Sequence, residues 1–360
     1  MNRFLFVPRR AWKGIVHSFT CWEWLGGRRH PYLVILASVG IGAGTAVLLG
    51  WLAGRANVLH VLAAVNPIWF LVCVGAEIVA YLGYVLALHE TARVDEGPRL
   101  GLAHTARVVA AGFGAFFAAS AAGGFEVDYW ALRRAGVPRR EALNRVMGLG
   151  TLEYVVLAPA ALGAALALLA GSGKHVYLSL TLPWLLVVPG FVFAGWASSP
   201  KRSSRMIDTR GMGRIRTMFG HMVSGLMVLR RLAANPLPHG GLAFTGTALY
   251  WFGEIACLWA ALQAFHADVA IPALILAYAT GYVVTRRAFP AGGVGISEVL
   301  LTFALFWLGV PFTPALLAVF SYRIFNFWLA LLPAFAVSGS VRRMREGMLQ
   351  LEREITADRS

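Results

Sequence analysis

The sequence predicts an all-α, polytopic helical membrane protein with about eight spans, an inverted repeat and two re-entrant hairpins with glycine-rich tips. Hydrophobic residues make up 58% of the 360 residues and charged residues only 14%, a balance that soluble domains do not have. Several apolar runs reach the ~20 residues that a helix needs to cross a bilayer. The positive charges lie mainly between these runs, as in membrane proteins whose loops set the orientation.

Apolar runs define the expected spans. Taken in chain order, they cover residues 33–53, 66–88, 104–122, 146–170, 176–196, 241–265, 270–289 and 314–338. Residues 296–309 form a further apolar helix that is short for a crossing. The first run follows a basic segment, but it is longer than the core of a signal peptide. We therefore expect a retained anchor, and we place residues 31–340 in a single membrane domain.

The charge distribution orients the chain. Residues 1–30 carry six Arg and Lys side chains, and the loop 197–239 and the tail 341–360 are also basic. Arg and Lys concentrate on the cytoplasmic side of a membrane protein. Both termini and the loop are therefore expected in the cytoplasm, with the protein in the cell inner (cytoplasmic) membrane.

The first hairpin follows from the same rule. If residues 104–122 crossed the membrane, the arginine-rich segment from Arg133 to Arg145 would lie outside. A turn at Gly123-Gly124 removes this conflict, because it returns the chain to the cytoplasmic side.

The second hairpin has the clearest local signal, the segment Pro290-Ala291-Gly292-Gly293-Val294-Gly295-Ile296-Ser297-Glu298. Glycines at this density let the backbone turn sharply and approach a ligand. A broken backbone at membrane depth survives only where protein packs around it or where it lines a wet cavity. The segment therefore predicts a binding site in the membrane domain.

Weak internal similarity relates the two hairpins. Gly136-Val137-Pro138 and Gly309-Val310-Pro311 follow the two glycine turns, and Glu77-Ile78 and Glu254-Ile255 lie in apolar runs upstream. The run 176–196 is an extra crossing between the halves. Repeats covering residues 66–170 and 241–338 would therefore be inverted, as in many transporters. Chance similarity in so biased a composition is the alternative.

Charged and polar side chains near the hairpins are the candidate ligand contacts. Arg286 and Arg287 precede the second turn, where two guanidinium groups suit a phosphate, although both side chains can also extend to the interface. Glu298 is a counter-charge for Arg287 or Arg323, a contact to a cationic head group, or an acid favoured by the helix dipole. The predicted substrate-binding set is Arg286, Arg287, Gly292, Gly293, Gly295, Glu298, Arg323, Asn326, Gly123, Gly124, Glu126, Asp128 and Glu153.

The last expected span carries an arginine. Arg323 and Asn326 are one turn apart and share a face, and Glu153 aligns with Asn326 in the repeat. An arginine within a membrane is costly and marks function. Glu77 and Glu254 are either its partners or structural groups satisfied within the fold. Glu126 and Asp128 follow the first turn as Glu298 follows the second, with a solvated helix face as the alternative.

The sequence contains no motif of soluble-enzyme chemistry. The three cysteines are far apart and suggest neither a disulfide framework nor a metal site, and there is no phosphate-binding loop or nucleophile turn. We expect no catalytic residue, no metal and no cofactor. The net charge of +15 would also suit nucleic acid. Basic clusters beside apolar spans already have an explanation, so nucleic acid is not expected as a partner.

The C-terminal repeat resembles the membrane region of the lysylphosphatidylglycerol synthase/flippase family, which includes stand-alone flippase-like proteins. The resemblance covers residues 31–340 and rests on Pro290, the Gly292-Gly293-x-Gly295-x-x-Glu298 pattern, Gly309 and Tyr322-Arg323. It implies a fold with re-entrant helices and movement of an aminoacylated phospholipid between leaflets. The sequence up to Ser360 does not contain the aminoacyl-transferase domain of the full-length enzymes, so the resemblance does not imply lipid synthesis.

The architecture and the resemblance together imply a lipid flippase or lipid-binding transporter. It would move an anionic or aminoacylated phospholipid, or a lipid-linked molecule, between leaflets. Two alternatives stay open: an integral-membrane transferase with Glu126, Asp128 or Glu298 as general base, and a non-catalytic partner of a lipid-modifying enzyme. Membrane phospholipids are the expected ligands, and a second copy or a lipid-modifying enzyme is the expected protein partner.

Overall fold

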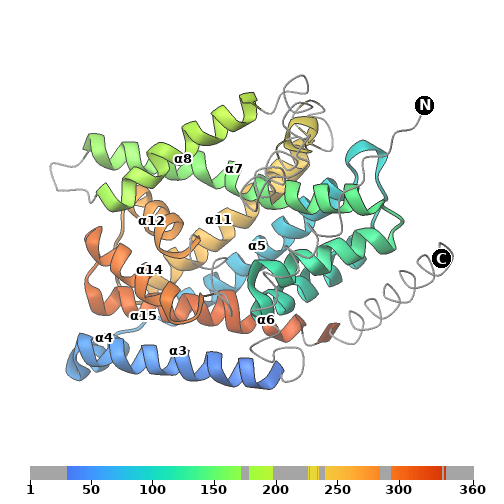
Figure 1. Cartoon of the computed structure of the whole chain (residues 1–360). Coiled ribbons are helices and arrows are strands. Elements are labelled where there is room, and N and C mark those ends of the chain that lie inside the picture. The colour runs from blue at the N-terminus through green and yellow to red at the C-terminus, as the bar shows by residue number, and fades with distance from the viewer. Residues whose placement is uncertain are drawn as a thin grey trace, which may run out of the picture.

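The computed structural model describes residues 31–171, 178–197, 226, 228–232, 234, 240–283, 293–334 and 336–337. Within these ranges every regular element is a helix (Figure 1), so the predicted all-α class is confirmed. The basic segments 1–30 and 341–360 lie outside the described residues, as does most of the loop 197–239. Their position relative to the membrane stays a prediction.

The helices follow the apolar runs. In chain order they are α3 (Pro31–Ala53), α4 (Arg55–Ala63), α5 (Ile68–Ala92), η1 (Val94–Glu96), α6 (Leu102–Arg134), α7 (Arg139–Gly171), α8 (Leu178–Ala197), α11 (Gly241–Ala264), α12 (Ile271–Tyr278), η3 (Ala279–Val283), α14 (Ile296–Trp307), α15 (Phe312–Arg323) and η5 (Ile324–Leu329). The π-helical turns η3 and η5 continue α12 and α15 directly.

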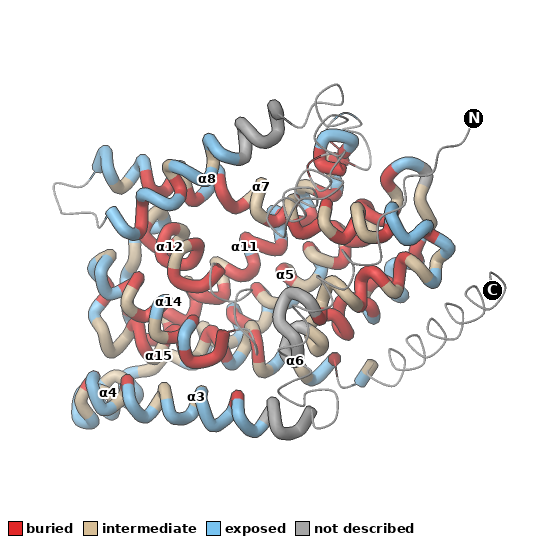
Figure 2. Tube along the Cα trace, viewed as in Figure 1, coloured by how far each residue is buried: buried red, intermediate tan, exposed pale blue. Residues whose placement is uncertain are grey.

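The described helices identify a membrane protein. Four stretches are long and apolar enough to cross a bilayer: Leu36–Ala53, Ile68–Ala92, Arg139–Gly171 and Phe312–Ala334. Helix α3 lies along one side of the molecule, where Figure 2 shows it largely exposed. Its exposed side chains include Leu36, Val47 and Trp51, which suit contact with acyl chains. The predicted total of eight spans stays a prediction.

Helices α5 and α11 pack against each other at the centre of the fold, and they run antiparallel. Cys73 near the start of α5 contacts Cys257 near the end of α11, whereas Gly83 farther along α5 meets Gly246 near the start of α11. A Cβ atom on Gly83 would lie only 2.5 Å from the backbone nitrogen of Tyr250. Small residues therefore let the two backbones touch, as is common between membrane helices.

Helix α6 doubles back on itself. A Cβ atom on Gly112 would lie 4.0 Å from the Cα atom of Gly124, whereas twelve residues of a straight α-helix advance about 18 Å. The chain therefore reverses between Gly112 and Gly124. The sequence placed the turn at Gly123-Gly124 itself. The structure puts Gly124 on the returning arm, where the missing side chains let the two arms approach closely.

The second predicted hairpin consists of two short arms that pack side by side, α12 with η3 and then α14. A Cβ atom on Gly281 would meet the Cα atom of Leu301 at 2.8 Å. The 12 residues of α14 advance about 18 Å, short of the ~30 Å hydrocarbon core. Residues 284–292, which include most of the predicted tip, lie outside the described part. Re-entry of either hairpin into a membrane stays a prediction.

Candidate functional site

A cavity of about 360 Å³ lies between the central helices and the first hairpin. Its walls come from α5, both arms of α6, α11, η3, and the segment from η5 to Pro333. Most of the lining is aliphatic or aromatic. Its polar groups include three carboxyl side chains, Glu77, Asp128 and Glu254, and the amide of Asn326.

The packing of α5 and α11 brings two of these acids together. Glu77 lies in the first half of α5, and Glu254 lies in the second half of α11. Because the helices are antiparallel and in backbone contact, both positions fall at the same level of the fold. The sequence places each acid in an apolar run, where a carboxyl group is retained only if it has a task.

Asp128 enters the cavity from the returning arm of α6, and its surroundings are shaped by glycine. A Cβ atom on Gly112 would lie 3.8 Å from Oδ1 of Asp128, so the opposite arm adds no side chain at that point. Asp128 is 2% exposed. In the described part of the structure it forms no hydrogen bond or ion pair, and Glu153 of α7 acts on it electrostatically.

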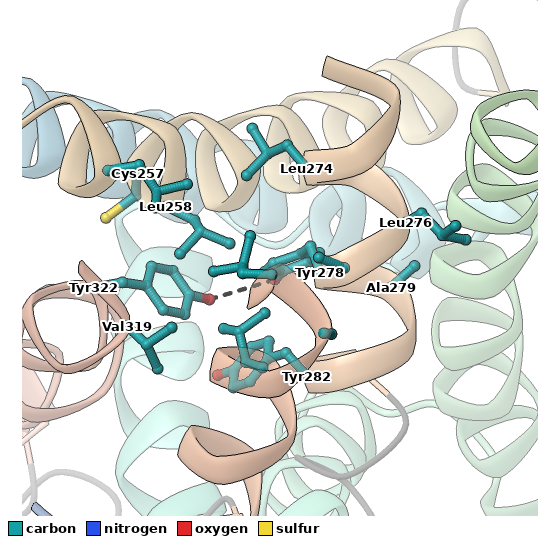
Figure 3. Close-up of a cluster of buried hydrophobic side chains, with 14 of the residues drawn as sticks. Cys257, Leu258, Leu274, Leu276, Tyr278, Ala279, Tyr282, Val319 and Tyr322 are labelled. Carbon is teal, nitrogen blue, oxygen red and sulfur yellow. Dashed lines mark hydrogen bonds between the residues drawn. The ribbon is translucent and has the colours of Figure 1, made fainter. Parts of the chain in front are cut away.

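Glu254 differs from Asp128, because donors surround it. Its Oε2 atom accepts hydrogen bonds from the hydroxyl of Tyr278 at 2.9 Å, the hydroxyl of Tyr322 at 2.5 Å and the amide of Asn326 at 2.7 Å. Figure 3 shows Tyr278 and Tyr322 directed toward each other in the buried cluster, with Tyr282 beside them. Three donors from three different helices therefore converge on one oxygen of Glu254.

Arg323 forms a buried ion pair with Glu298. Its Nε donates to Oε1 of Glu298 at 2.6 Å, and a terminal nitrogen donates to the hydroxyl of Tyr282 at 3.0 Å. The guanidinium carbon lies 4.3 Å from the ring centre of Phe327. The other carboxylate oxygen of Glu298 accepts the N–H of Gly295 at 2.6 Å. Arg323 thus fixes the start of α14 against α15.

One further bond joins this ion pair to the cavity. The hydroxyl of Tyr282 donates to the Oδ1 atom of Asn326 at 2.7 Å, and Asn326 in turn donates to Glu254. A continuous polar chain therefore runs from the second hairpin to the cavity wall. We call this chain of Glu298, Arg323, Tyr282, Asn326 and Glu254 the polar relay.

The predicted site residues fall into four groups. Asp128, Gly124 and Asn326 line the cavity, and Glu298, Arg323 and Gly295 belong to the polar relay or cap it. A further group belongs to neither set: Gly123, Glu153 and Gly293 are buried, and Glu126 is half-buried. The φ of Gly293 is 70°, in the left-handed region. Arg286, Arg287 and Gly292 lie outside the described residues.

The sequence suggested two possible sets of partners for Arg323: Glu298, or Glu77 and Glu254. The guanidinium lies against Glu298, and among the described contacts it does not reach Glu254 directly. The predicted set omitted Glu77 and Glu254 as ligand contacts, and it omitted all three tyrosines. The spacing of four between Tyr278 and Tyr282, which places both on one helical face, is the signal that would have found two of them.

Residues 35–334 match a family model that is described as the transmembrane region of lysylphosphatidylglycerol synthase. The match includes the cavity, the polar relay and both hairpins. Among curated proteins, none matches this chain.

Proposed function

The chain belongs to the lysylphosphatidylglycerol synthase transmembrane-region family, and from this premise we propose that it is a lipid flippase. The proposed substrate is a phospholipid whose head group carries an amine, such as an aminoacylated phospholipid. The cavity bounded by α5, α6 and α11 is the proposed binding site. The family supports a role with membrane lipids, and the cavity supports the substrate class.

The observation that carries the proposal is the buried carboxyl of Asp128, which has no partner among the described residues. A carboxylate removed from water is costly unless a cation or donors compensate it. Asp128 has neither within the described chain, and Glu77 and Glu254 line the same cavity. An ammonium group on a lipid head would supply the missing charge.

The size and lining of the cavity suit the polar part of an amphiphile. A volume of about 360 Å³ lies within the range of small-ligand sites, roughly 300 to 1,000 Å³. Aromatic walls from Tyr81, Tyr84 and Phe113 accommodate an ammonium group through their ring faces. In this proposal the acyl chains stay in the hydrocarbon layer, and only the head group enters the protein.

The two hairpins have different proposed tasks. The returning arm of α6 presents Asp128 to the amine, and Arg286 and Arg287, which lie outside the described residues, are the proposed contacts to the lipid phosphate. Interrupted helices that meet near the midplane give access to a site from either leaflet. This assignment separates the two charges of the head group between the two hairpins.

The test is exchange of fluorescent lipids in proteoliposomes. The full chain is reconstituted in vesicles that contain fluorescent lysylphosphatidylglycerol or fluorescent phosphatidylglycerol, and a reductant that bleaches the probe is added outside. The rate at which the inner-leaflet probe is bleached is then compared for the two lipids. We expect faster exchange of the amine-bearing lipid and a loss of about tenfold in Asp128→Asn, equivalent to about 1.4 kcal/mol.

Asp268→Asn is the matched control, because Asp268 is exposed and lies away from the cavity. Its exchange rate should equal that of the unaltered protein. Equal rates for both lipids in the unaltered protein, or normal exchange of the amine-bearing lipid in Asp128→Asn, would show that the carboxyl does not recognise the amine.

A further inference from the structure

We infer that the cavity opens sideways into the hydrocarbon layer through a window between α5 and the C-terminal span Phe312–Ala334, and that the acyl chains of a bound lipid lie across this window. Its rim is formed by Ile78 of α5 and by Leu329, Ala330 and Pro333 of the C-terminal span, all of which line the cavity. The inference rests on the proposed function and adds the route by which the lipid reaches the site.

The exposed part of the cavity lining lies on one side. Among the lining residues in the described part of the structure, only Ile78, Leu329 and Pro333 are exposed. Ile78 is 54% exposed and Leu329 is 37% exposed. The lining residues of α6, α11 and η3 are all buried or half-buried. The cavity therefore reaches the surface of the described structure between α5 and the C-terminal span, and the residues at its mouth are apolar.

The two edges of the window belong to helices that suit a bilayer. The stretches Ile68–Ala92 and Phe312–Ala334 are both long and apolar enough to cross it. Beside the rim, Leu82 of α5 and Ile324 of η5 are also exposed. Aliphatic side chains on the outside of a membrane helix are in contact with acyl chains rather than with water. The occupant that fits the mouth of the cavity is therefore the apolar part of a lipid, with its head group directed inward toward Asp128.

Side-chain contacts close the window at both ends. At one end the ring of Phe70, near the start of α5, packs against Phe325, with the ring centres 5.7 Å apart. At the other end a Cβ atom on Gly114 would lie 2.6 Å from the Cβ atom of Ala334, so the first arm of α6 meets the C-terminal span there. From Phe325 to Ala334 a helix advances by at most about 14 Å. The opening is therefore confined to one level of the two helices and does not separate them along their length.

The C-terminal edge of the window has an irregular backbone. The π-helical turn η5 covers Ile324–Leu329, and Pro333 follows one turn later. Proline has no N–H group, so Pro333 cannot donate a helical hydrogen bond to the carbonyl of Leu329. Irregular backbone at membrane depth is tolerated where protein packs around it or where it lines a cavity, and π-helical turns are frequent at functional sites. A carbonyl group at the rim would accept a hydrogen bond from the ammonium group as the head group passes.

Photolabelling from the acyl chain tests the window directly. The full chain in nanodiscs is irradiated with lysylphosphatidylglycerol that carries a diazirine on one acyl chain, and mass spectrometry maps the labelled residues. Phosphatidylglycerol with the same diazirine reports general contact with lipid. The ratio of the two labels around Ile78 and Leu329 should exceed that around Val47, on the exposed face of α3, by about threefold, because a bound head group raises the effective concentration of its acyl chains there. Asp128→Asn should abolish this excess.

Two rim variants test whether lipids pass through the window. Ile78→Trp and Ala330→Trp place a large side chain on opposite edges of the opening, so exchange of fluorescent lysylphosphatidylglycerol in proteoliposomes should fall by about tenfold in each. Leu71→Trp and Leu332→Trp are the matched controls, because both leucines are exposed on the same two spans and neither lines the cavity. Their exchange rates should equal that of the unaltered protein.

The outcomes separate the window from the proposed function. Selective exchange of the amine-bearing lipid by the unaltered protein, with equal label ratios at the window and on α3 or with rim variants as fast as their controls, would overturn the window and leave the flippase proposal standing. Absence of selectivity for the amine-bearing lipid in the unaltered protein would overturn both. The photolabelling needs no substitution at the rim, so it decides the question even where a tryptophan variant unfolds.

Discussion

The contact between α5 and α11 makes a sharp prediction about Gly83. Substitution of Gly83 by alanine would place the new methyl carbon 2.5 Å from the nitrogen of Tyr250 and 2.6 Å from the carbonyl oxygen of Gly246. Both of these atoms belong to the backbone, so neither can rotate away. Gly75 of the same helix is the matched control, because a methyl group there would meet nothing within 4 Å.

The magnitude follows from two opposing effects. Overpacking at a tight contact costs about 1–3 kcal/mol, because the two helices must separate by about 1 Å to restore an ordinary carbon contact near 3.5 Å. Replacing a mid-helix glycine by alanine contributes up to about 1 kcal/mol of stability. Gly75→Ala receives only the second effect. Because both variants receive the second effect, they should differ by the overpacking cost alone, about 1–3 kcal/mol in unfolding free energy.

Thermal unfolding in detergent, followed by circular dichroism, measures this difference. We expect Gly83→Ala to melt on the order of 5 °C below Gly75→Ala, since 1 kcal/mol shifts Tm by roughly 2–4 °C in mid-sized domains. Lipid exchange should fall as well, because Glu77 and Glu254 would move apart with their helices. Equal melting temperatures for the two variants would show that α5 and α11 do not approach as closely as the structure indicates.

Three further predictions concern the polar relay and the start of α14. Arg323→Met should lower the unfolding free energy by about 3–5 kcal/mol, because it leaves Glu298 charged and unpaired. Adding the second change, Glu298→Gln, should restore most of that loss. Chemical unfolding of the single and the double variant checks this. Tyr322→Phe removes one of three donors to a buried carboxylate and should cost about 1.5–3 kcal/mol in the same measurement. Gly295 has a φ of 90°, and a Cβ atom there would lie 2.9 Å from Ile41, so Gly295→Ala should lower the unfolding free energy by at least about 1–2 kcal/mol. Gly44→Ala, where a Cβ atom would meet nothing within 4 Å, should not lower it.

These three predictions have separate failure conditions. No recovery in the double variant would mean that Arg323 stabilises the fold by packing rather than by pairing with Glu298. Unchanged stability in Tyr322→Phe would mean that the hydroxyl is not needed by Glu254. Equal melting of the variants at positions 295 and 44 would exclude a left-handed backbone at the start of α14.

The helical architecture was predictable because its causes are local in the sequence. Each run of apolar residues has the length and composition of a helix, and the described helices begin and end within a few residues of most of these runs. The reversal of α6 was also predictable, because the basic residues near Arg133 conflict with a simple crossing. Its location was misplaced by several residues, since glycine serves both turns and close helix contacts.

The partners of the buried charges were harder to predict. The sequence suggested Arg323 as one of several partners for Glu298. Only the packing of α14 against α15 shows that Arg323 is the partner. The role of Glu77 and Glu254 depends on the antiparallel register of α5 with α11, which relates positions far apart in the sequence. The cavity itself depends on the space beside Gly112, and an absent side chain gives no sequence signal of its own.

The two hairpins hold their acidic residues in opposite ways, and this asymmetry bears on how the proposed transporter works. Glu298 after the second glycine turn is bound to Arg323 and Gly295, so its charge is already compensated and its helix is fixed. Asp128 after the first turn has no such partner in the described chain. A ligand shifts an equilibrium only where it changes the energy of one state relative to another. In the proposed transporter a cationic head group at Asp128 would have that effect, whereas a ligand near Glu298 would first have to displace a buried guanidinium. In the proposed transporter we therefore expect the returning arm of α6 to respond to the substrate, and α14 with the polar relay to stay fixed.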